Sequence, residues 1–301
     1  MPLKKKSKIY SHSRLSTFEK CPMKFKFQYI DKIIPEVEQT IESHLGKSVH
    51  EVLEWFYTQV KKGKTPSIDE MILYYTYIWK ENYAPETLIV KKYLTEKDYF
   101  NKGVQFLLNY YTENSPFDDN TLETEKRILI NLDKDGAYKM QGFIDRLVYN
   151  AETGEYEIHD YKTANSMPSK EKINEDRQLA IYSIAIKELF GYDKDVCLIW
   201  HYLAHNQKIC IRKANSELSK LKKDIIELID SIESSKEFPA KKSALCSWCE
   251  YKNVCPEFGG TPPKKEIQKK FESIFSNNRK DSSDEVEEII EISEKEKLDI
   301  W

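Results

Sequence analysis

The sequence predicts an α/β or α+β fold in which helices flank a mixed sheet. Segment 140–163 contains two runs of strand composition joined by a turn, and amphipathic stripes of helical period occur before and after it. The expected order of elements is helix, three strands, helix, two strands, helix. With 301 residues, 40% of them hydrophobic, the chain can build one core and an elaborated second lobe.

The segment 140–163 has the pattern of a β-hairpin. Strand-like residues fill 143–149 and 156–162, and residues 150–155 supply the turn, in which Gly154 can adopt a positive φ. We expect Asn150 to pair with Glu155. The alternative is a three-residue loop with a bulge at Gly154. It would shift the strand pairing by one residue and direct the paired side chains to the opposite face of the sheet.

Two aspartates and a lysine of this hairpin form a candidate metal site. In the register set by the turn, Asp145 lies directly opposite Asp160, with Cβ atoms roughly 5 Å apart. Facing carboxylates repel each other unless a cation lies between them, and such a pair suits Mg²⁺ or Mn²⁺. Lys162 projects from the face of Asp160, where an ammonium can orient or help deprotonate a water that attacks a phosphate. The plain alternative is an exposed hairpin with scattered charges.

The residues before the hairpin are expected to be mainly helical. After a frayed basic end at 1–13, a short helix capped by Ser16 or Thr17 lies within 15–29, and a longer one over 47–60 carries His50 beside its apolar stripe. A lone histidine of this kind is more often a core or surface residue than a ligand. Helices over 67–82 and 95–114 form an aromatic-rich lobe, whose rings belong to the core or, at one or two surface positions, stack on unpaired bases.

The remaining elements follow from period and capping: a strand over 122–131, the hairpin, a polar loop over 163–174, a helix over 176–190 stopped by Gly191, a second hairpin from 195–203 and 207–213, and a helix over 216–234. Glu123 and Glu125 are expected at solvated strand positions, with membership of the acidic cluster as the alternative. Gln178 and Tyr182 lie one turn apart, either as a surface pair or facing a substrate.

Four of the six cysteines form a metal-binding pattern. Cys246, Cys249 and Cys255 have the spacing C-x₂-C-x₅-C, and Cys21 can supply the fourth thiolate, which suits either a [4Fe–4S] cluster or tetrahedral zinc. Closing this site would enclose more than 220 residues. Cys197 and Cys210 lie in apolar strand runs and are expected to be small core residues.

Net charge and hydropathy limit the classes of function that are expected. The net charge is −3, but residues 281–301 hold nine acidic residues against two lysines, so the rest carries +4, which is compatible with a polyanionic substrate. No run is apolar enough to span a membrane and the start lacks an apolar leader, so a soluble cytoplasmic protein is expected. The acidic tail is solvated and disordered, a docking peptide for a protein partner, or an arm that covers a basic groove.

Together these features resemble the RecB/AddB-type branch of the PD-(D/E)XK nuclease superfamily that carries an iron–sulfur cluster, a group that includes the CRISPR-associated RecB-like exonucleases. The resemblance runs from about Ser16 to Pro256. It rests on six motifs that occur in the order found in the family: Cys21-Pro, Gly46-x₃-His50, Gly142-Phe-Ile-Asp145-Arg, Asp160-Tyr-Lys162-Thr, Gln178-x₃-Tyr182, and the C-x₂-C-x₅-C motif followed by Pro256.

The resemblance implies a role for each matching residue. His50, Asp145 and Asp160 are implied ligands of the catalytic ion, with the carbonyl group of Tyr161 as an additional ligand. Lys162 is implied to position the attacking water and stabilise charge on the phosphate. Gln178 and Tyr182 are implied to contact DNA, and the four cysteines, Cys21, Cys246, Cys249 and Cys255, to hold a structural [4Fe–4S] cluster instead of zinc.

The implied function is a Mg²⁺- or Mn²⁺-dependent DNase, acting as an exonuclease on single-stranded DNA or duplex ends. The alternative is a DNA-binding nuclease subunit or adaptor of a helicase–nuclease or CRISPR-adaptation complex. The expected parts are a first segment with Cys21 and His50 (1–63), a helical lobe (64–117) longer than in the smallest family members, a core with the cluster cysteines (118–258), and a tail outside the resemblance (259–301).

Overall fold

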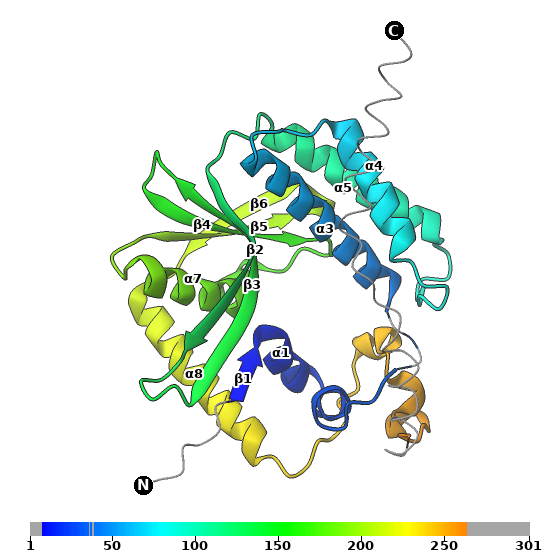
Figure 1. The fold of residues 1–301 in the computed structure, drawn as a ribbon. Helices are drawn as coiled ribbons and strands as arrows, with labels where there is room; N and C mark the ends of the chain where they lie inside the picture. The colour runs from blue at the N-terminus through cyan, green and yellow to red at the C-terminus, as the bar shows by residue number, and fades with distance from the viewer. Residues whose placement is uncertain (1–7, 36, 38, 264–301) are drawn as a thin grey trace.

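The structure is a computed structural model that describes residues 8–35, 37 and 39–263 (Figure 1). The expectations for the acidic tail concern residues outside this described part. Its longer elements are β1 (Lys8–Ser11), α1 (His12–Lys20), α2 (Pro22–Phe25), α3 (Ile41–Lys61), α4 (Ile68–Glu81), α5 (Glu96–Asn114), β2 (Thr121–Asn131), β3 (Tyr138–Asn150), β4 (Glu155–Lys162), α6 (Lys170–Asn174), α7 (Arg177–Phe190), β5 (Val196–Tyr202), β6 (Gln207–Arg212) and α8 (Asn215–Ser234). A π-helical turn spans Lys26–Ile30, and four 3₁₀ turns span Leu203–His205, Ala244–Trp248, Lys252–Val254 and Pro256–Phe258.

One mixed sheet organises these elements. The strand order is β1-β3-β4-β5-β6, in which β1 and β4 pair with the two ends of one edge of β3. β2 pairs with the opposite edge of β3. The pairs β1–β3 and β4–β5 are parallel, whereas β2–β3, β3–β4 and β5–β6 are antiparallel. The predicted fold class, a mixed sheet flanked by helices, is confirmed.

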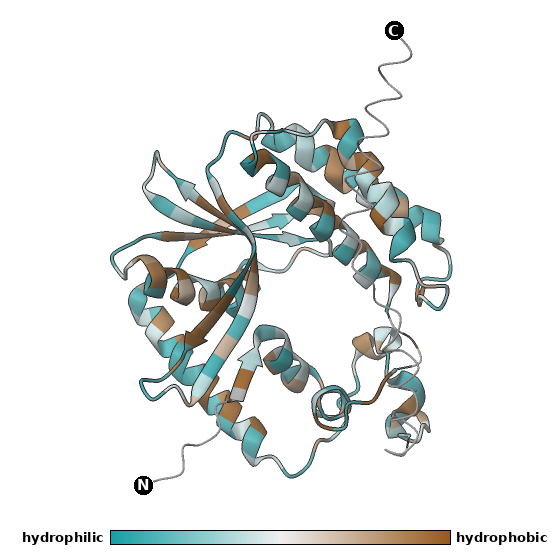
Figure 2. Ribbon diagram, in the orientation of Figure 1, coloured by the Kyte–Doolittle hydropathy of each residue, from teal (hydrophilic) through white to brown (hydrophobic). Residues whose placement is uncertain are grey.

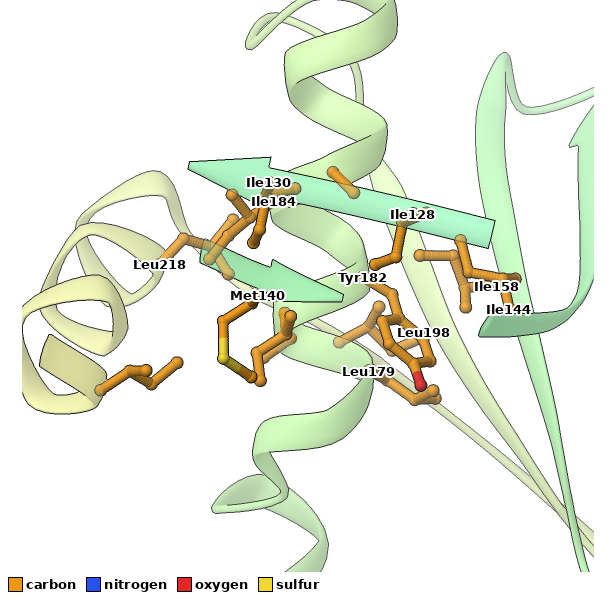
Figure 3. Close-up of a cluster of buried hydrophobic side chains, with 14 of the residues drawn as sticks. Ile128, Ile130, Met140, Ile144, Ile158, Leu179, Tyr182, Ile184, Leu198 and Leu218 are labelled. Carbon is orange, nitrogen blue, oxygen red and sulfur yellow. The ribbon is translucent and has the colours of Figure 1, made fainter. Parts of the chain in front are cut away.

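Helices cover both faces of the sheet (Figure 1). On one face α7 and α8 pack through a core of mainly aliphatic residues, and Figure 3 shows side chains from β2, β3, β4, β5, α7 and α8 meeting there. On the other face α3, α4 and α5 form an aromatic-rich core that includes Tyr161 of β4. The hydropathy colouring shows mixed brown and teal on these helices, as expected for amphipathic elements with one buried face (Figure 2).

The N-terminal part departs from the prediction. Lys8–Ser11 forms a parallel strand against β3, although 1–13 was expected to be frayed. The aromatic ring of Tyr10 explains the strand, because it is fully buried and its hydroxyl donates to Glu233 of α8. Helix α3 begins at Ile41, earlier than expected, because Thr40 accepts a hydrogen bond from the Ser43 N–H as an N-cap. Residues 170–174, expected as loop, form the short helix α6.

Two further findings concern the strands and helices of the described part. Cys197 and Cys210 are joined by a disulfide between β5 and β6, and Cys210 is exposed, so the expectation of two small core residues is wrong for Cys210. Their approach depends on cross-strand register, which strand composition does not reveal. No helix in the described residues is long and apolar enough to cross a membrane.

Candidate metal centre

The β3–β4 hairpin has the predicted register. Asn150 pairs with Glu155, Gly154 has a φ of +72°, and the ladder continues to Arg146 opposite His159. The ladder ends there, one pair before Asp145 and Asp160. The register with a bulge at Gly154 is therefore excluded.

Asp145 lies where the alternation of β3 is broken. Ile144 and Leu147 are three residues apart, yet both pack in the core beneath α7, whereas regular alternation would direct them to opposite faces. Asp145 consequently turns toward the end of β4, where its Oδ2 accepts a hydrogen bond of 3.0 Å from the Tyr161 N–H. The carboxylate is fixed by backbone and remains 13% exposed.

His50 approaches this carboxylate from α3. Its Nδ1 lies 3.3 Å from Asp145 Oδ2, and its Nε2 donates to the Tyr161 carbonyl oxygen at 2.7 Å. The helix holds the ring in place, because Val49, Val52 and Leu53 of the same turn are buried in the aromatic-rich core. Three groups that the sequence suggested as ligands therefore meet: the imidazole, the Asp145 carboxylate and the Tyr161 carbonyl.

Asp160 and Lys162 form the second part of the site. Asp160 is nearly fully buried, and its Oδ2 lies 2.6 Å from Lys162 Nζ. The ammonium also donates to Gln178 Oε1 of α7 at 3.0 Å. Gln178 Nε2 in turn donates to the hydroxyl of Tyr182 at 3.4 Å. The sequence motif with a glutamine and a tyrosine one turn apart is thus connected to the lysine of the hairpin.

Gly142 is needed for the position of Tyr182. A Cβ at residue 142 would lie 2.5 Å from the Tyr182 ring, so any side chain there would displace it. The ring is 6% exposed, and burial raises the pKa of Tyr182 to about 12, which keeps its hydroxyl protonated. Glycine in β3 therefore allows α7 to lie close enough to bring Gln178 to Lys162.

Glu125 of β2 is an acidic residue that the sequence analysis placed in solvent. The pairs Thr124 with Arg146 and Lys126 with Ile144 put it beside Asp145, on the edge of β3 opposite to β4. Ligand atoms of His50, Glu125 and Asp145 all lie within 4.8 Å of one another. The expectation of a solvated position is therefore wrong, and the alternative of a place in the acidic cluster holds.

A surface depression of about 510 Å³ opens over these groups. It is lined by Gly46, Lys47, His50, Glu51, Glu54 and Glu125. Glu51 and Glu54 were not predicted as site residues. The available signal was their position on α3, because Glu54 lies one turn beyond His50 and so shares its side of the helix.

Several carboxylates lie close together in the site and shift one another's pKa values. Burial and then the Asp160 carboxylate raise the pKa of Asp145 well above its ordinary value. Burial, then Asp145 and Glu54, raise the pKa of Glu125 to about 7. Although burial alone would lower it, the Asp160 carboxylate raises the pKa of Lys162 above its ordinary value. A divalent cation would relieve this repulsion.

A second buried polar group, the rear network, joins β3 and β4 to residues of α3, α5 and β5. We define it as Arg146, Asp119, His159, His201, Tyr161, Tyr110 and Tyr57. The Arg146 guanidinium is fully buried, lies over the Tyr57 ring, donates to the Tyr161 hydroxyl and to His159 Nδ1, and pairs with Asp119. His159 stacks on His201 and donates from Nε2 to Glu157.

The four candidate cysteines line one small cavity. Cys21 reaches it from the segment between α1 and α2, and Cys246, Cys249 and Cys255 from the 3₁₀ turns near the end of the described chain. Both parts are held together by the hydrogen bond from the Met23 N–H to the Pro239 carbonyl and by the 2.7 Å ion pair between Lys24 and Glu250. The predicted gathering of these cysteines is thus present in the structure.

The comparisons with known proteins agree with this geometry. The family model described as PD-(D/E)XK nuclease superfamily matches residues 9–256. The chain belongs to the PD-(D/E)XK nuclease superfamily. Members of this superfamily are nucleases that generally use divalent metal ions, and the acidic group at His50, Glu125 and Asp145 offers such an ion a place.

Two solved structures align over most of the chain. One, described as SSO0001, is 15% identical, covers 84% of this chain and 88% of its own, and has a TM-score of 0.38. Another, from Eubacterium rectale and described as a "Putative exonuclease", is 10% identical, covers 89% and 92%, and has a TM-score of 0.49. A comparison with curated proteins gives no match.

Proposed function

We propose that this protein is a Mg²⁺- or Mn²⁺-dependent deoxyribonuclease of the RecB-like type that acts as an exonuclease on single-stranded DNA or duplex ends. The observation that carries the proposal is the meeting of His50, Asp145, Asp160 and Lys162 at one end of the β3–β4 hairpin. Superfamily membership supports nuclease chemistry. The preference for DNA and for ends rests on the RecB-like motifs of the sequence.

The donor groups fit a divalent ion. Ligands of an ion with metal–oxygen distances of about 2.1 Å must lie within roughly 4.2 Å of one another, and the atoms of His50, Glu125 and Asp145 already lie within 4.8 Å. One imidazole nitrogen among oxygens favours Mn²⁺ over the harder Mg²⁺. A bound ion would polarise the scissile phosphate and lower the pKa of the attacking water.

The residues of the chain then have separate roles. Asp145, oriented by the Tyr161 N–H, and His50 hold the ion from two elements. Lys162 stays protonated beside Asp160, so it orients the water and stabilises phosphate charge instead of accepting a proton. Gln178 keeps the Lys162 ammonium aligned from α7. We retain the half-buried Gln178 as the expected DNA-facing residue, with the buried Tyr182 holding its amide group through the tyrosine hydroxyl.

We further propose that the four cysteines bind a [4Fe–4S] cluster with a structural role. In tetrahedral zinc sites the sulfur atoms lie about 3.8 Å apart, since Zn–S distances are about 2.3 Å. Among the described residues, no three of the four cysteine sulfurs lie within 4.8 Å of one another, which is wider than a closed zinc site requires. Lys241 and Lys252 line the same cavity and would help to balance an anionic cluster, whereas Lys24 and Lys242 are paired with Glu250 and Glu257.

Anaerobic purification followed by digestion of 5′- and 3′-labelled single- and double-stranded DNA with each metal tests the nuclease assignment. We expect metal-dependent cleavage from ends. Asp160→Ala and Lys162→Ala should lower cleavage by roughly 10²–10³-fold or more and leave DNA binding and iron content largely intact. Cleavage that survives Asp160→Ala would refute the site assignment.

Iron content and colour test the cluster. We expect a brown protein with about four irons per chain after anaerobic purification, and Cys21→Ala should lose the iron and impair the Asp145 site from a distance. Cys197→Ala is the matched control and should keep the iron, because Cys197 lies in β5 and is bonded to Cys210. A colourless, zinc-containing protein would contradict the proposal.

A further inference from the structure

Glu125 differs from the other acidic residue on the same strand. Glu123 is exposed and forms ion pairs with Lys61 and Lys126 at 3.7 and 3.5 Å. Glu125, two residues later, is partly buried, and the charged groups around its carboxylate are Asp145, Glu54, His50 and Asp160. Its carboxylate instead lies beside His50 and Asp145. A partly buried carboxylate beside another carboxylate is destabilising without a cation.

The backbone of β2 directs Glu125 toward the site. Its φ is +44°, a left-handed conformation inside a strand, which interrupts the alternation that sends Ile128 and Ile130 into the core beneath α7. The irregularity lies at the level of Asp145, where the alternation of β3 is also broken. Both strands therefore deviate at the same level, and the deviations bring two carboxylates under His50.

We propose that Glu125 is a ligand of the divalent ion and holds it together with His50 and Asp145. The inference rests on the proposed function, because it adds a ligand to the same site. The geometry favours it over a site built from His50, Asp145 and Asp160 alone. Asp160 is bound to Lys162 at 2.6 Å, whereas Glu125 has its carboxylate within 4.8 Å of both other ligands.

In this arrangement the residues next to the two edges of β3 have different roles. Glu125 on the β2 side, with His50 above, holds the ion, while Asp160 on the β4 side aligns Lys162. Glu54 remains at the mouth of the depression, where its charge adds to the attraction for a cation. The chain therefore binds the ion with a nitrogen and carboxylates from three elements: α3, β2 and β3.

The test compares Glu125→Gln with Glu123→Gln by Mn²⁺ titration and by thermal unfolding with and without Mn²⁺, using the full chain. Glutamine keeps the shape of the side chain, so folding should be retained. We expect Glu125→Gln to weaken Mn²⁺ binding about tenfold or more, to raise the unfolding temperature of the metal-free protein, and to reduce the stabilisation by Mn²⁺. Glu123→Gln should bind Mn²⁺ like the wild type.

Each other outcome is decisive. Mn²⁺ affinity of Glu125→Gln within twofold of the wild type overturns the proposal. Equal weakening by both variants also overturns it, because the effect would then be that of net charge on the strand. A wild-type protein that binds no Mn²⁺ contradicts the proposed function itself, and this result is distinguishable from the first two. If Glu125→Gln fails to fold, Glu125→Asp serves in its place, with a smaller loss expected.

Discussion

Asp145 and Arg146 are neighbours on β3, yet the chain surrounds their charges in opposite ways. Around Arg146, the rear network supplies a carboxylate, a hydroxyl, a neutral imidazole and an aromatic face, so the buried cation is fully partnered. Around Asp145 there are two more carboxylates, Glu125 and Asp160, and one ammonium, which Asp160 already holds. One side of the hairpin is complete by itself, whereas the other lacks positive charge.

Within one pair of strands, the residues around Arg146 stabilise the fold, whereas the residues around Asp145 are suited to bind a ligand. A closed network of hydrogen bonds holds the side chains of Arg146, His159 and Tyr161 together. An open cluster of carboxylates on the other side is retained only if a ligand relieves its repulsion. The rear network therefore positions the residues that the front side uses, and substitutions on the two sides should have opposite effects on the metal-free protein.

Arg146→Met should have the largest effect on stability. It leaves His159, Tyr161 and Asp119 without their shared donor, and removal of one partner of a buried charged group costs on the order of 3–5 kcal/mol. Urea unfolding of the metal-free protein measures this loss. Arg127→Met is the control, because Arg127 is exposed on β2 and should change stability by less than about 0.5 kcal/mol. Similar stability of the two variants would show that the rear network is not structural.

Asp145→Asn should change the free energy of unfolding of the metal-free protein by a smaller amount and in the opposite direction. The amide oxygen can still accept the Tyr161 N–H, while the repulsion by Asp160 and Glu125 disappears, so metal-free stability should rise by roughly 1 kcal/mol. Thermal unfolding in the presence of a chelator checks this increase. A loss of stability comparable with that of Arg146→Met would remove the distinction between the two sides.

The smallest effect is expected in the pH dependence of unfolding. Burial first, and then neighbouring positive groups, lower the pKa values of His159 and His201 well below 6.5 in the folded state. Their contribution to stability is thus present above the unfolded pKa and is lost as the pH falls below about 6.5. His201→Gln should reduce the difference in unfolding free energy between pH 7.5 and pH 5.

The opposite slope should come from the metal site. Glu125, whose pKa is raised to about 7, contributes stability below its unfolded value near 4.5 and loses it as the pH rises through 7. Unfolding curves of Glu125→Gln and His201→Gln over the same pH range separate the two contributions. Parallel pH profiles for the two variants and the wild type would contradict the assignment of opposite slopes.

Much of this could be predicted from local sequence. The turn at Asn150–Glu155 set the register of the hairpin, and the helices predicted from 67, 95 and 176 begin after N-caps at these positions. The predicted cap at Ser16 or Thr17 is wrong, because Ser11 caps α1 and both residues lie inside that helix. The cysteine spacing indicated that Cys21 lies near the other three cysteines. These features depend on residues close in sequence or on a motif whose partner is recognisable. The fold class followed from the order of such elements.

What could not be predicted depends on long-range geometry. β1 exists because Tyr10 is buried against β3 and α8, although its own composition indicates a frayed end. Glu125 enters the site because a single φ of +44° interrupts the alternation of β2. Gln178 meets Lys162 because Gly142 lets Tyr182 pack closely. None of these contacts is encoded in the period or spacing of its own segment.

A calorimetric titration of Mn²⁺ into the metal-free wild type and Asp145→Asn tests the central claim that the uncompensated carboxylates form a cation site. We predict saturable binding to the wild type, at least tenfold weaker binding to Asp145→Asn, and unchanged binding to Arg127→Met. Equal Mn²⁺ affinity of the wild type and Asp145→Asn would contradict the account.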